Sequence, residues 1–195
     1  MIITWVAFMA CFCSFAVGIR YGFARASGEK LDLRARLILI ISTAFAVVHL
    51  VALVRPRSGP KVAIICVAIY TLSLLLFWKC LSTTRRQQLP VAFSAHRPQR
   101  IVREGPYRHV RHPIYVSYML AWSACPVATG QPWPAVCAAT MAVIYYHAAR
   151  SEEQALLSGP LGPDYLLYRR TTGMVLPRSV HGHDDHCEVA RHRAG

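Results

Sequence analysis

The segment Gly105–Tyr115 concentrates side chains that can bind a charged ligand. Its eleven residues include two arginines, two histidines and two tyrosines. An uncharged run, Pro113–Ala149, begins within it. Polar groups placed directly against such a run suggest a polar site at a membrane surface, with walls formed by the adjoining helices. The alternative is a basic juxtamembrane loop that only sets membrane orientation.

Charged and apolar residues are segregated along the chain. Of the 195 residues, 54% are hydrophobic and 16% are charged, and the length suits one domain. Three stretches of 17 or 18 residues contain no Lys, Arg, Asp or Glu: Ile2–Ile19, Leu37–Val54 and Val62–Trp78. Each is close to the roughly 20 residues that cross a bilayer, whereas a soluble core helix would show a polar face. We therefore predict three membrane-spanning helices here.

The fourth uncharged run, Pro113–Ala149, is too long at 37 residues for one crossing. A Gly/Pro cluster, Thr129–Pro134, interrupts it and is typical of a turn. The run therefore predicts two short antiparallel helices in a tight hairpin. The expected fold is an all-α integral membrane protein with about five transmembrane helices.

The net charge of +13 is explained by topology. With the amino terminus outside, 19 of the 22 Lys and Arg residues fall on the inner side. This bias follows the positive-inside rule and predicts a cytosolic carboxyl terminus. We accordingly expect no nucleic-acid partner, although basic proteins often bind one.

Several other residue types have simple structural interpretations. Most of the seven cysteines fall in apolar spans and suit small buried packing groups rather than disulfides or a metal cage. His49, inside the second span, is a candidate functional group, but a neutral histidine bonded to a neighbouring helix is favoured. The tail 179–195 is rich in histidine, and we expect disorder there and no metal site.

Two charged clusters must meet at the inner end of the hairpin. Arg108, Arg111 and His112 open its first helix, and Arg150, Glu152 and Glu153 close its second. Antiparallel helices joined by a short turn place these ends side by side. The modest interpretation is a salt-bridge seam that holds the hairpin together and, if exposed, adds little stability.

The pattern Gly-Pro-Tyr-Arg-x-Val-Arg-His-Pro-x-Tyr at Gly105–Tyr115, followed by Glu152-Glu153-x-x-Leu156 and then Gly162-x-x-Tyr165-x-x-Tyr168, resembles the isoprenylcysteine carboxyl methyltransferase family and its phospholipid methyltransferase relatives. The resemblance covers roughly residues 96–178. It implies an integral membrane enzyme that uses S-adenosylmethionine in a cytosol-facing pocket and takes a lipophilic acceptor from the bilayer. We expect three parts: three transmembrane helices in 1–81, a methyltransferase core in 82–178 made of a cytosolic loop, the hairpin and a C-terminal segment, and the tail 179–195.

The resemblance also assigns site residues by position. The implied cofactor-binding residues are Gln99, Ile101, Val102, Tyr107, Arg111, His112, Pro113, Tyr115, Glu152 and Glu153. An arginine that orients the acceptor normally lies about one turn before the acidic pair. That position is Ala148 here, so Arg150 takes the role by proximity, and the implied catalytic residues are Arg150 and Glu153.

The cofactor carries a carboxylate, an ammonium and a sulfonium, which suits these residue types. Arginine can bind a carboxylate through two parallel bonds, and a glutamate can bind the ammonium or the ribose hydroxyls. A carboxylate acceptor is already ionised near neutral pH and needs no base. An amine or phenol acceptor needs one, and His109, His147 and Glu153 are candidates.

The leading hypothesis is carboxyl O-methylation of a prenylcysteine-like or other lipid substrate. Methylation of a lipid amine, phenol or thiol competes with it, as does a non-catalytic transporter or scaffold. A transporter would more often show broken helices paired across two inverted halves. The expected location is the cell membrane with the site facing the cytosol. The sequence leaves the oligomeric state open.

Overall fold

The computed structural model describes residues 2–24, 33–54, 59–86 and 100–178. These residues form six α-helices and a short 3-10 helix, η1, with no strand among them. The elements are α1 (Ile2–Ala24), α2 (Leu33–Leu53), α3 (Pro60–Arg86), η1 (Gly105–Arg108), α4 (Pro113–Thr129), α5 (Pro132–Leu157) and α6 (Gly162–Thr171). The all-helical prediction is confirmed for the described residues.

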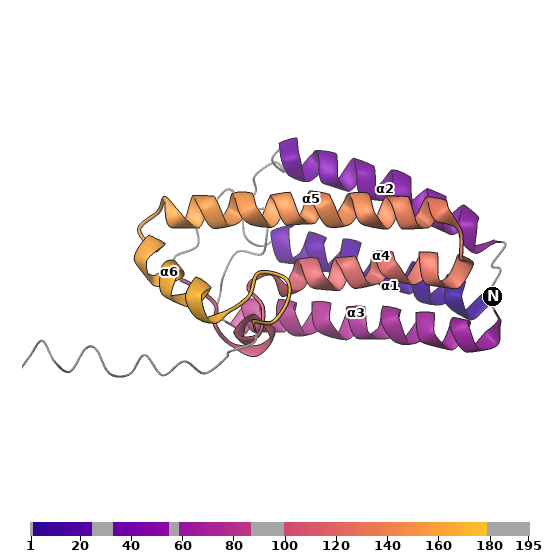
Figure 1. Cartoon of the computed structure of the whole chain (residues 1–195), viewed down its shortest axis with the longest axis horizontal. Helices are drawn as coiled ribbons and strands as arrows, with labels where there is room; N and C mark the ends of the chain where they lie inside the picture. The colour runs from indigo at the N-terminus through magenta and orange to yellow at the C-terminus, as the bar shows by residue number, and fades with distance from the viewer. Residues whose placement is uncertain (1, 25–32, 55–58, 87–99, 179–195) are drawn as a thin grey trace, which may run out of the picture.

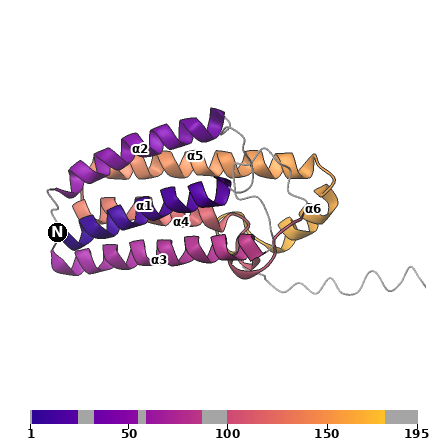
Figure 2. The ribbon, with the colours of Figure 1, turned by 180° about the vertical axis from the view of Figure 1, so that it is seen from behind.

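The five long helices lie side by side as a bundle, and α6 lies beyond one end of it, where α5 extends past the other helices (Figures 1 and 2). Helix α3 packs along both α1 and α4, and α5 packs against α4 and α2. The predicted division after residue 81 falls in the last turns of α3. That division stays a prediction.

Two helices, α2 and α3, are long and apolar enough to cross a membrane, and α1 contains a shorter apolar stretch, Ile2–Gly18. Only 17% of the apolar window of α2 and 33% of that of α3 are buried by protein. A core helix of a soluble protein would be mostly buried, so the bilayer is the natural cover for these faces. Five crossings and their orientation stay predictions.

The predicted hairpin is confirmed. Helix α4 ends at Thr129, and Gly130 adopts φ 61°, a left-handed conformation that glycine reaches without steric penalty. Pro132 then begins α5, where its missing N–H leaves no helical hydrogen bond unmade. The short turn forces α4 and α5 to run antiparallel.

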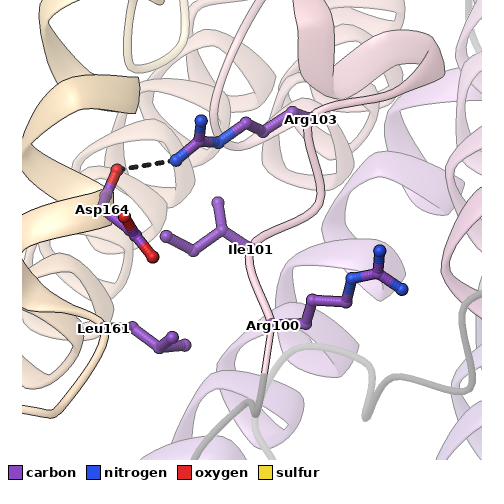
Figure 3. Close-up of a pocket in the computed structure, with 5 residues that line it drawn as sticks. All are labelled: Arg100, Ile101, Arg103, Leu161 and Asp164. Atoms are coloured by element: carbon purple, nitrogen blue, oxygen red, sulfur yellow. Dashed lines mark hydrogen bonds between the residues drawn. The ribbon is translucent and has the colours of Figure 1, made fainter.

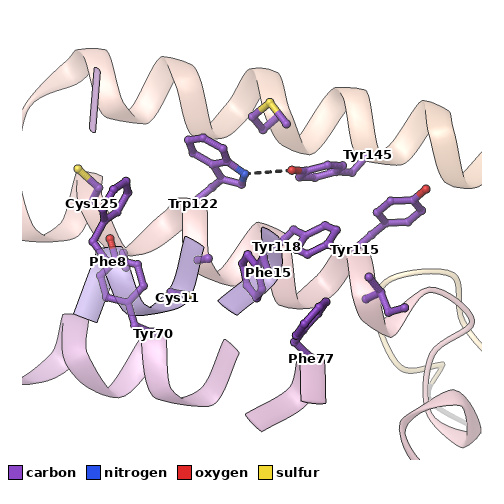
Figure 4. Close-up of a cluster of buried hydrophobic side chains, with 14 of the residues drawn as sticks. Phe8, Cys11, Phe15, Tyr70, Phe77, Tyr115, Tyr118, Trp122, Cys125 and Tyr145 are labelled. Atoms are coloured by element: carbon purple, nitrogen blue, oxygen red, sulfur yellow. Dashed lines mark hydrogen bonds between the residues drawn. The ribbon is translucent and has the colours of Figure 1, made fainter. Parts of the chain in front are cut away.

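Aromatic side chains fill the interior of the bundle (Figure 4). Trp122 of α4 donates a hydrogen bond of 3.1 Å from Nε1 to the Tyr145 hydroxyl of α5. The rings of Phe15, Phe77 and Tyr118 meet in edge or tilted contacts from three helices. This packing fixes α1, α3, α4 and α5 around one core and sets the positions of the helix ends.

The predicted structural roles of the cysteines and His49 agree with this core. Five of the six described cysteines are buried, and all six are free thiols. His49 is fully buried, with Nε2 3.2 Å from the Pro134 carbonyl oxygen of α5. The interpretation of His49 as a group bonded to a neighbouring helix is confirmed. The histidine-rich tail lies outside the described residues.

Candidate active site at the foot of the helical hairpin

The hairpin brings the start of α4 to the level of the end of α5. Helix α4 has 17 residues, so it rises about 25 Å from Pro113 to Thr129. An equal rise along α5 from Pro132 reaches Ala148. Glu152 and Glu153 therefore lie about one turn past the level at which α4 begins, beside the residues that precede it.

Glu153 is the most firmly held group at this site. Its Oε1 atom accepts hydrogen bonds from Arg111 Nε at 2.8 Å and from His112 Nε2 at 3.1 Å, and the residue is 5% exposed. Burial alone would raise the pKa of this carboxyl, but the bonds from His112 and Arg111 outweigh it and lower the pKa to about 2. Glu153 is therefore a fixed negative charge at neutral pH.

Glu152 occupies a different environment one residue earlier. Its Oε1 atom accepts a 2.7 Å hydrogen bond from the Tyr115 hydroxyl, and its Oε2 atom lies 3.6 Å from His112 Nδ1. A third of its side chain is exposed. Burial of its carboxyl raises its pKa, and Glu153 adds to the shift, while His112 and Tyr115 oppose it. Glu152 is thus the more exposed side chain of the pair.

His112 and Tyr115 link the two carboxylates. The two ring nitrogens of His112 face Glu152 and Glu153 respectively. The Tyr115 ring stacks on His112 at a centroid distance of 5.8 Å and on Tyr145 at 5.5 Å. Pro113 begins α4 between them and fixes the backbone at the point where the polar segment enters the bundle.

Arg111 also joins the site to the chain that follows α6. Its Nη1 atom donates to the carbonyl oxygen of Thr172 and, at 3.4 Å, to that of Arg169. The backbone N–H groups of Arg111 and His112 donate to Gly173 O at 2.8 Å and to Met174 O at 3.0 Å. We call residues Gly173–Arg178 the C-terminal strap, because its backbone is hydrogen-bonded to the two residues that bind Glu153.

Tyr107 anchors the preceding segment. Its backbone carbonyl accepts a hydrogen bond from the Tyr168 hydroxyl of α6, and burial raises the pKa of its phenol. Gly105, at the start of η1, has φ 57°, and a Cβ there would lie 2.9 Å from Thr83 Oγ1 of α3. The close approach to α3 explains glycine at this position.

A pocket of about 370 Å³ opens next to this segment, lined by Arg100, Ile101, Arg103, Leu161 and Asp164 (Figure 3). Ile101 and Leu161 provide apolar walls, and the Asp164 carboxylate points towards Ile101 (Figure 3). Arg103 donates a 2.8 Å hydrogen bond to the Asp164 carbonyl oxygen. Its guanidinium also lies 5.8 Å from the centre of the Tyr168 ring. The pocket thus combines two apolar side chains with one carboxylate and two arginines.

The structure brings together most of the residues that the sequence assigned. Arg111, His112, Pro113, Tyr115, Glu152 and Glu153 form one cluster, and Ile101, Val102 and Tyr107 lie in the segment that leads to it. Arg111 and His112 bind Glu153 here, so a direct role for them in binding a cofactor carboxylate stays a prediction. Arg108, which we also expected in the seam, is exposed. Gln99 lies outside the described residues.

Arg150 is separate from this cluster. It is exposed, and its guanidinium lies 5.9 Å from the centre of the Tyr146 ring, one turn earlier on α5. Its contact therefore runs back along the helix and away from the acidic pair. Its assignment as the residue that orients the acceptor stays a prediction without a supporting contact.

Sequence reasoning missed three features. Asp164 and Leu161 line the pocket, and Arg34 of α2 reaches α5 next to the acidic pair. The strap residues were also missed. Asp164 carried a signal, since it is the next acidic residue after Glu153. Arg34 carried none, because an arginine at the start of a membrane helix is ordinary.

Fold and site together define a helical membrane protein with a buried, charged cluster at one end of its bundle. The chain belongs to the phospholipid methyltransferase family, whose sequence model matches residues 61–161. This is the family of isoprenylcysteine carboxyl methyltransferase-like proteins, and it indicates a membrane methyltransferase acting on lipid-like substrates. The match spans α3, the hairpin and the acidic pair. A search of curated proteins gave no match.

Proposed function

We propose that the chain transfers a methyl group from S-adenosylmethionine to a lipophilic acceptor at the cytosolic face of the cell membrane. The observation that carries the proposal is the clamp on Glu153 by Arg111 and His112, with Glu152 beside it and partly open. A charged cluster at the end of an apolar bundle suits a reaction between a charged cofactor and a lipid-soluble acceptor.

The residues present fit the cofactor. Its ammonium and ribose hydroxyls call for carboxylates, and Glu152 is partly exposed while Asp164 lines the pocket. The apolar walls formed by Ile101 and Leu161 suit a purine ring. The volume of about 370 Å³ is within the range of small-molecule sites. When bound, the cofactor supplies an electrophilic methyl group on a sulfonium.

The protein's own contribution is alignment and charge. Methyl transfer is an in-line displacement, so the reacting atoms must be held about 3–3.5 Å apart. The bonds from Arg111 and His112 fix the position of Glu153. The bond from Tyr115 fixes the Glu152 carboxylate. Burial of His112 and Glu153 strengthens their contact.

None of the bases that the sequence suggested is well suited to remove a proton from an acceptor. Glu153 is held ionised with a pKa of about 2 by His112 and Arg111 against the effect of burial, so it is a poor base. His109 and His147, the other candidate bases, are both exposed. Carboxyl O-methylation of a prenylcysteine-like or other lipid acid is therefore the form of the reaction that we propose.

The charge distribution supports a cytosolic site. Arg34, Arg85 and Arg111 lie at the site end of the bundle, and Lys61 lies at the other end among the described residues. Cytoplasmic loops carry such an excess of Lys and Arg.

The experiment is methyl transfer by the purified full-length chain in detergent. The protein is incubated with methyl-labelled S-adenosylmethionine and, in turn, a prenylcysteine analogue with a free carboxyl group, its amide, and membrane lipid extracts. Label should enter the carboxyl compound and leave the amide unlabelled. His112→Ala should abolish transfer, and Arg85→Gln, which removes an exposed cation at the end of α3, should not. Label in lipid amines instead would overturn the carboxylate assignment.

A further inference from the structure

Helix α2 packs antiparallel to α5 in a register set by three polar contacts. Arg34 Nη1 donates to Ser151 Oγ at 2.8 Å, Ser42 Oγ donates to Met141 Sδ at 4.0 Å, and His49 Nε2 lies 3.2 Å from Pro134 O. As the residue number rises along α2 from 34 to 49, the number of the partner on α5 falls from 151 to 134. This register places the first turn of α2 at the level of the acidic pair of α5.

Arg34 therefore lies on a separate helix at the level of the acidic pair. Its hydrogen-bond partner, Ser151, is the neighbour of Glu152 in the chain. A guanidinium has five N–H donors, and Ser151 takes one of them, so the exposed remainder can bind an anion. The hydroxyl holds the guanidinium against α5 without neutralising it.

The surface of α2 beyond Arg34 is suited to an acyl or prenyl chain. Leu37, Ile40, Val47 and Val51 are large apolar side chains that the protein leaves exposed along this helix. In a bilayer these side chains contact lipid, and Arg34 lies where that apolar surface meets the aqueous side. A lipid lying along α2 would therefore have its head group beside Arg34 and within the neighbourhood of Glu152.

Arg150 offers no comparable arrangement. Its guanidinium lies over the Tyr146 ring on the exposed face of α5, whereas Arg34 bridges from α2 to α5. Of these two arginines, Arg34 is the one that bridges two helices at the end of the bundle.

We propose that Arg34, held by Ser151, binds the anionic head group of the lipophilic acceptor. The proposal rests on the proposed methyl transfer and adds a residue to it. The expected ligand is the carboxylate of the proposed acceptor, and a phosphate on a hydrocarbon chain is the alternative that the test distinguishes. Bidentate hydrogen bonding makes arginine well suited to either group.

The test compares lipid binding by the full-length chain and its variants in a nonionic detergent, measured by native mass spectrometry. The probes are oleate for a carboxylate, dioleoyl phosphatidate for a phosphate, and dioleoylglycerol as a neutral lipid. Arg34→Gln should weaken binding of an anionic probe about 10-fold or more, as expected for loss of a hydrogen bond to a charged group. Binding of dioleoylglycerol should be unchanged. Which anionic probe responds identifies the head group.

Matched variants separate this role from general charge or folding effects. Arg34→Lys should restore part of the anionic binding, and Arg85→Gln should leave it unchanged. Binding of S-adenosylmethionine should be the same in Arg34→Gln as in the wild type. Once an acceptor is in hand, Arg34→Gln should raise KM with a smaller change in kcat. Thermal unfolding confirms that each variant is folded.

The contrary outcomes are distinct. Equal weakening by Arg34→Gln and Arg85→Gln, or no weakening by either, would overturn the role of Arg34 while leaving the methyltransferase intact. Failure of the wild type to bind S-adenosylmethionine would overturn the proposed function and, with it, the acceptor role of Arg34.

Discussion

The hydroxyl of Tyr115 donates a 2.7 Å hydrogen bond to the carboxylate of Glu152, which lies 37 residues further along the chain. This contact joins the first turn of α4 to the last turns of α5 and exists because the hairpin returns the chain on itself. On the next residue, Glu153 is bound by Arg111 and His112. The two adjacent glutamates thus share His112 but differ in their second partner, which is Tyr115 for Glu152 and Arg111 for Glu153.

The first prediction is that these two glutamates differ in their effect on stability. Glu153→Gln leaves Arg111 and His112 without their buried carboxylate, and loss of one partner of a buried ion pair lowers the unfolding free energy by about 3 kcal/mol. Glu152→Gln removes a carboxyl whose pKa is raised by burial, so it should preserve or increase stability at neutral pH. A thiol-reactive dye that reports exposure of the buried cysteines on heating measures both. Equal losses would contradict the distinction.

The second prediction concerns acid. The pKa of Glu153 is lowered from its ordinary value near 4.5 to about 2. Its contribution to stability is therefore complete above about pH 4.5 and is lost as pH falls towards 2. The midpoint of thermal unfolding of the wild type should drop over this range. Glu153→Gln, already destabilised at neutral pH, should show a smaller drop, and parallel curves would count against the ion-paired carboxylate.

Much of this site follows from sequence because its geometry is simple. The uncharged run and the turn at Gly130 predict a hairpin, and a hairpin necessarily brings Arg111–Tyr115 next to Glu152 and Glu153. The sequence does not predict which of the two glutamates forms the ion pair with Arg111. Adjacent residues on a helix point about 100° apart, and small differences in packing decide which one turns towards α4.

Other contacts lack any local signal. The strap meets Arg111 and His112 through backbone hydrogen bonds, which leave no trace in side-chain types. The contact between Arg34 and Ser151 depends on where α2 settles against α5. Helix α2 is apolar on most of its surface, so no periodic pattern predicts which side faces the protein.

The third prediction tests the strap. A Cβ atom at Gly173 would overlap the Leu176 carbonyl oxygen and lie 3.1 Å from Arg178 N, so Gly173→Ala must open the turn. The N–H groups of Arg111 and His112 should then exchange hydrogen faster, as measured by mass spectrometry. Gly59→Ala is the control, because no atom lies within 4 Å of the added methyl. Unchanged exchange in Gly173→Ala would mean that the strap does not close the site.

The fourth prediction separates a structural histidine from a site histidine. His49→Ala removes a fully buried ring bonded to Pro134 and should lower the unfolding temperature while leaving affinity for S-adenosylmethionine unchanged in the folded protein. His112→Ala removes the group between Glu152 and Glu153 and should abolish that affinity. Titration of both variants below their unfolding temperatures provides the comparison. Similar loss of affinity in both would show that the cofactor site lies elsewhere.

The most direct measurement is calorimetric titration of the folded full-length chain, in detergent, with S-adenosylmethionine. The proposed function predicts saturable binding with one cofactor per chain, lost in His112→Ala and retained in Arg85→Gln. Absence of binding by the folded wild-type chain, or equal binding by His112→Ala, would contradict the central claim. That claim is that the start of α4 and the end of α5 together form a site for the methyl donor.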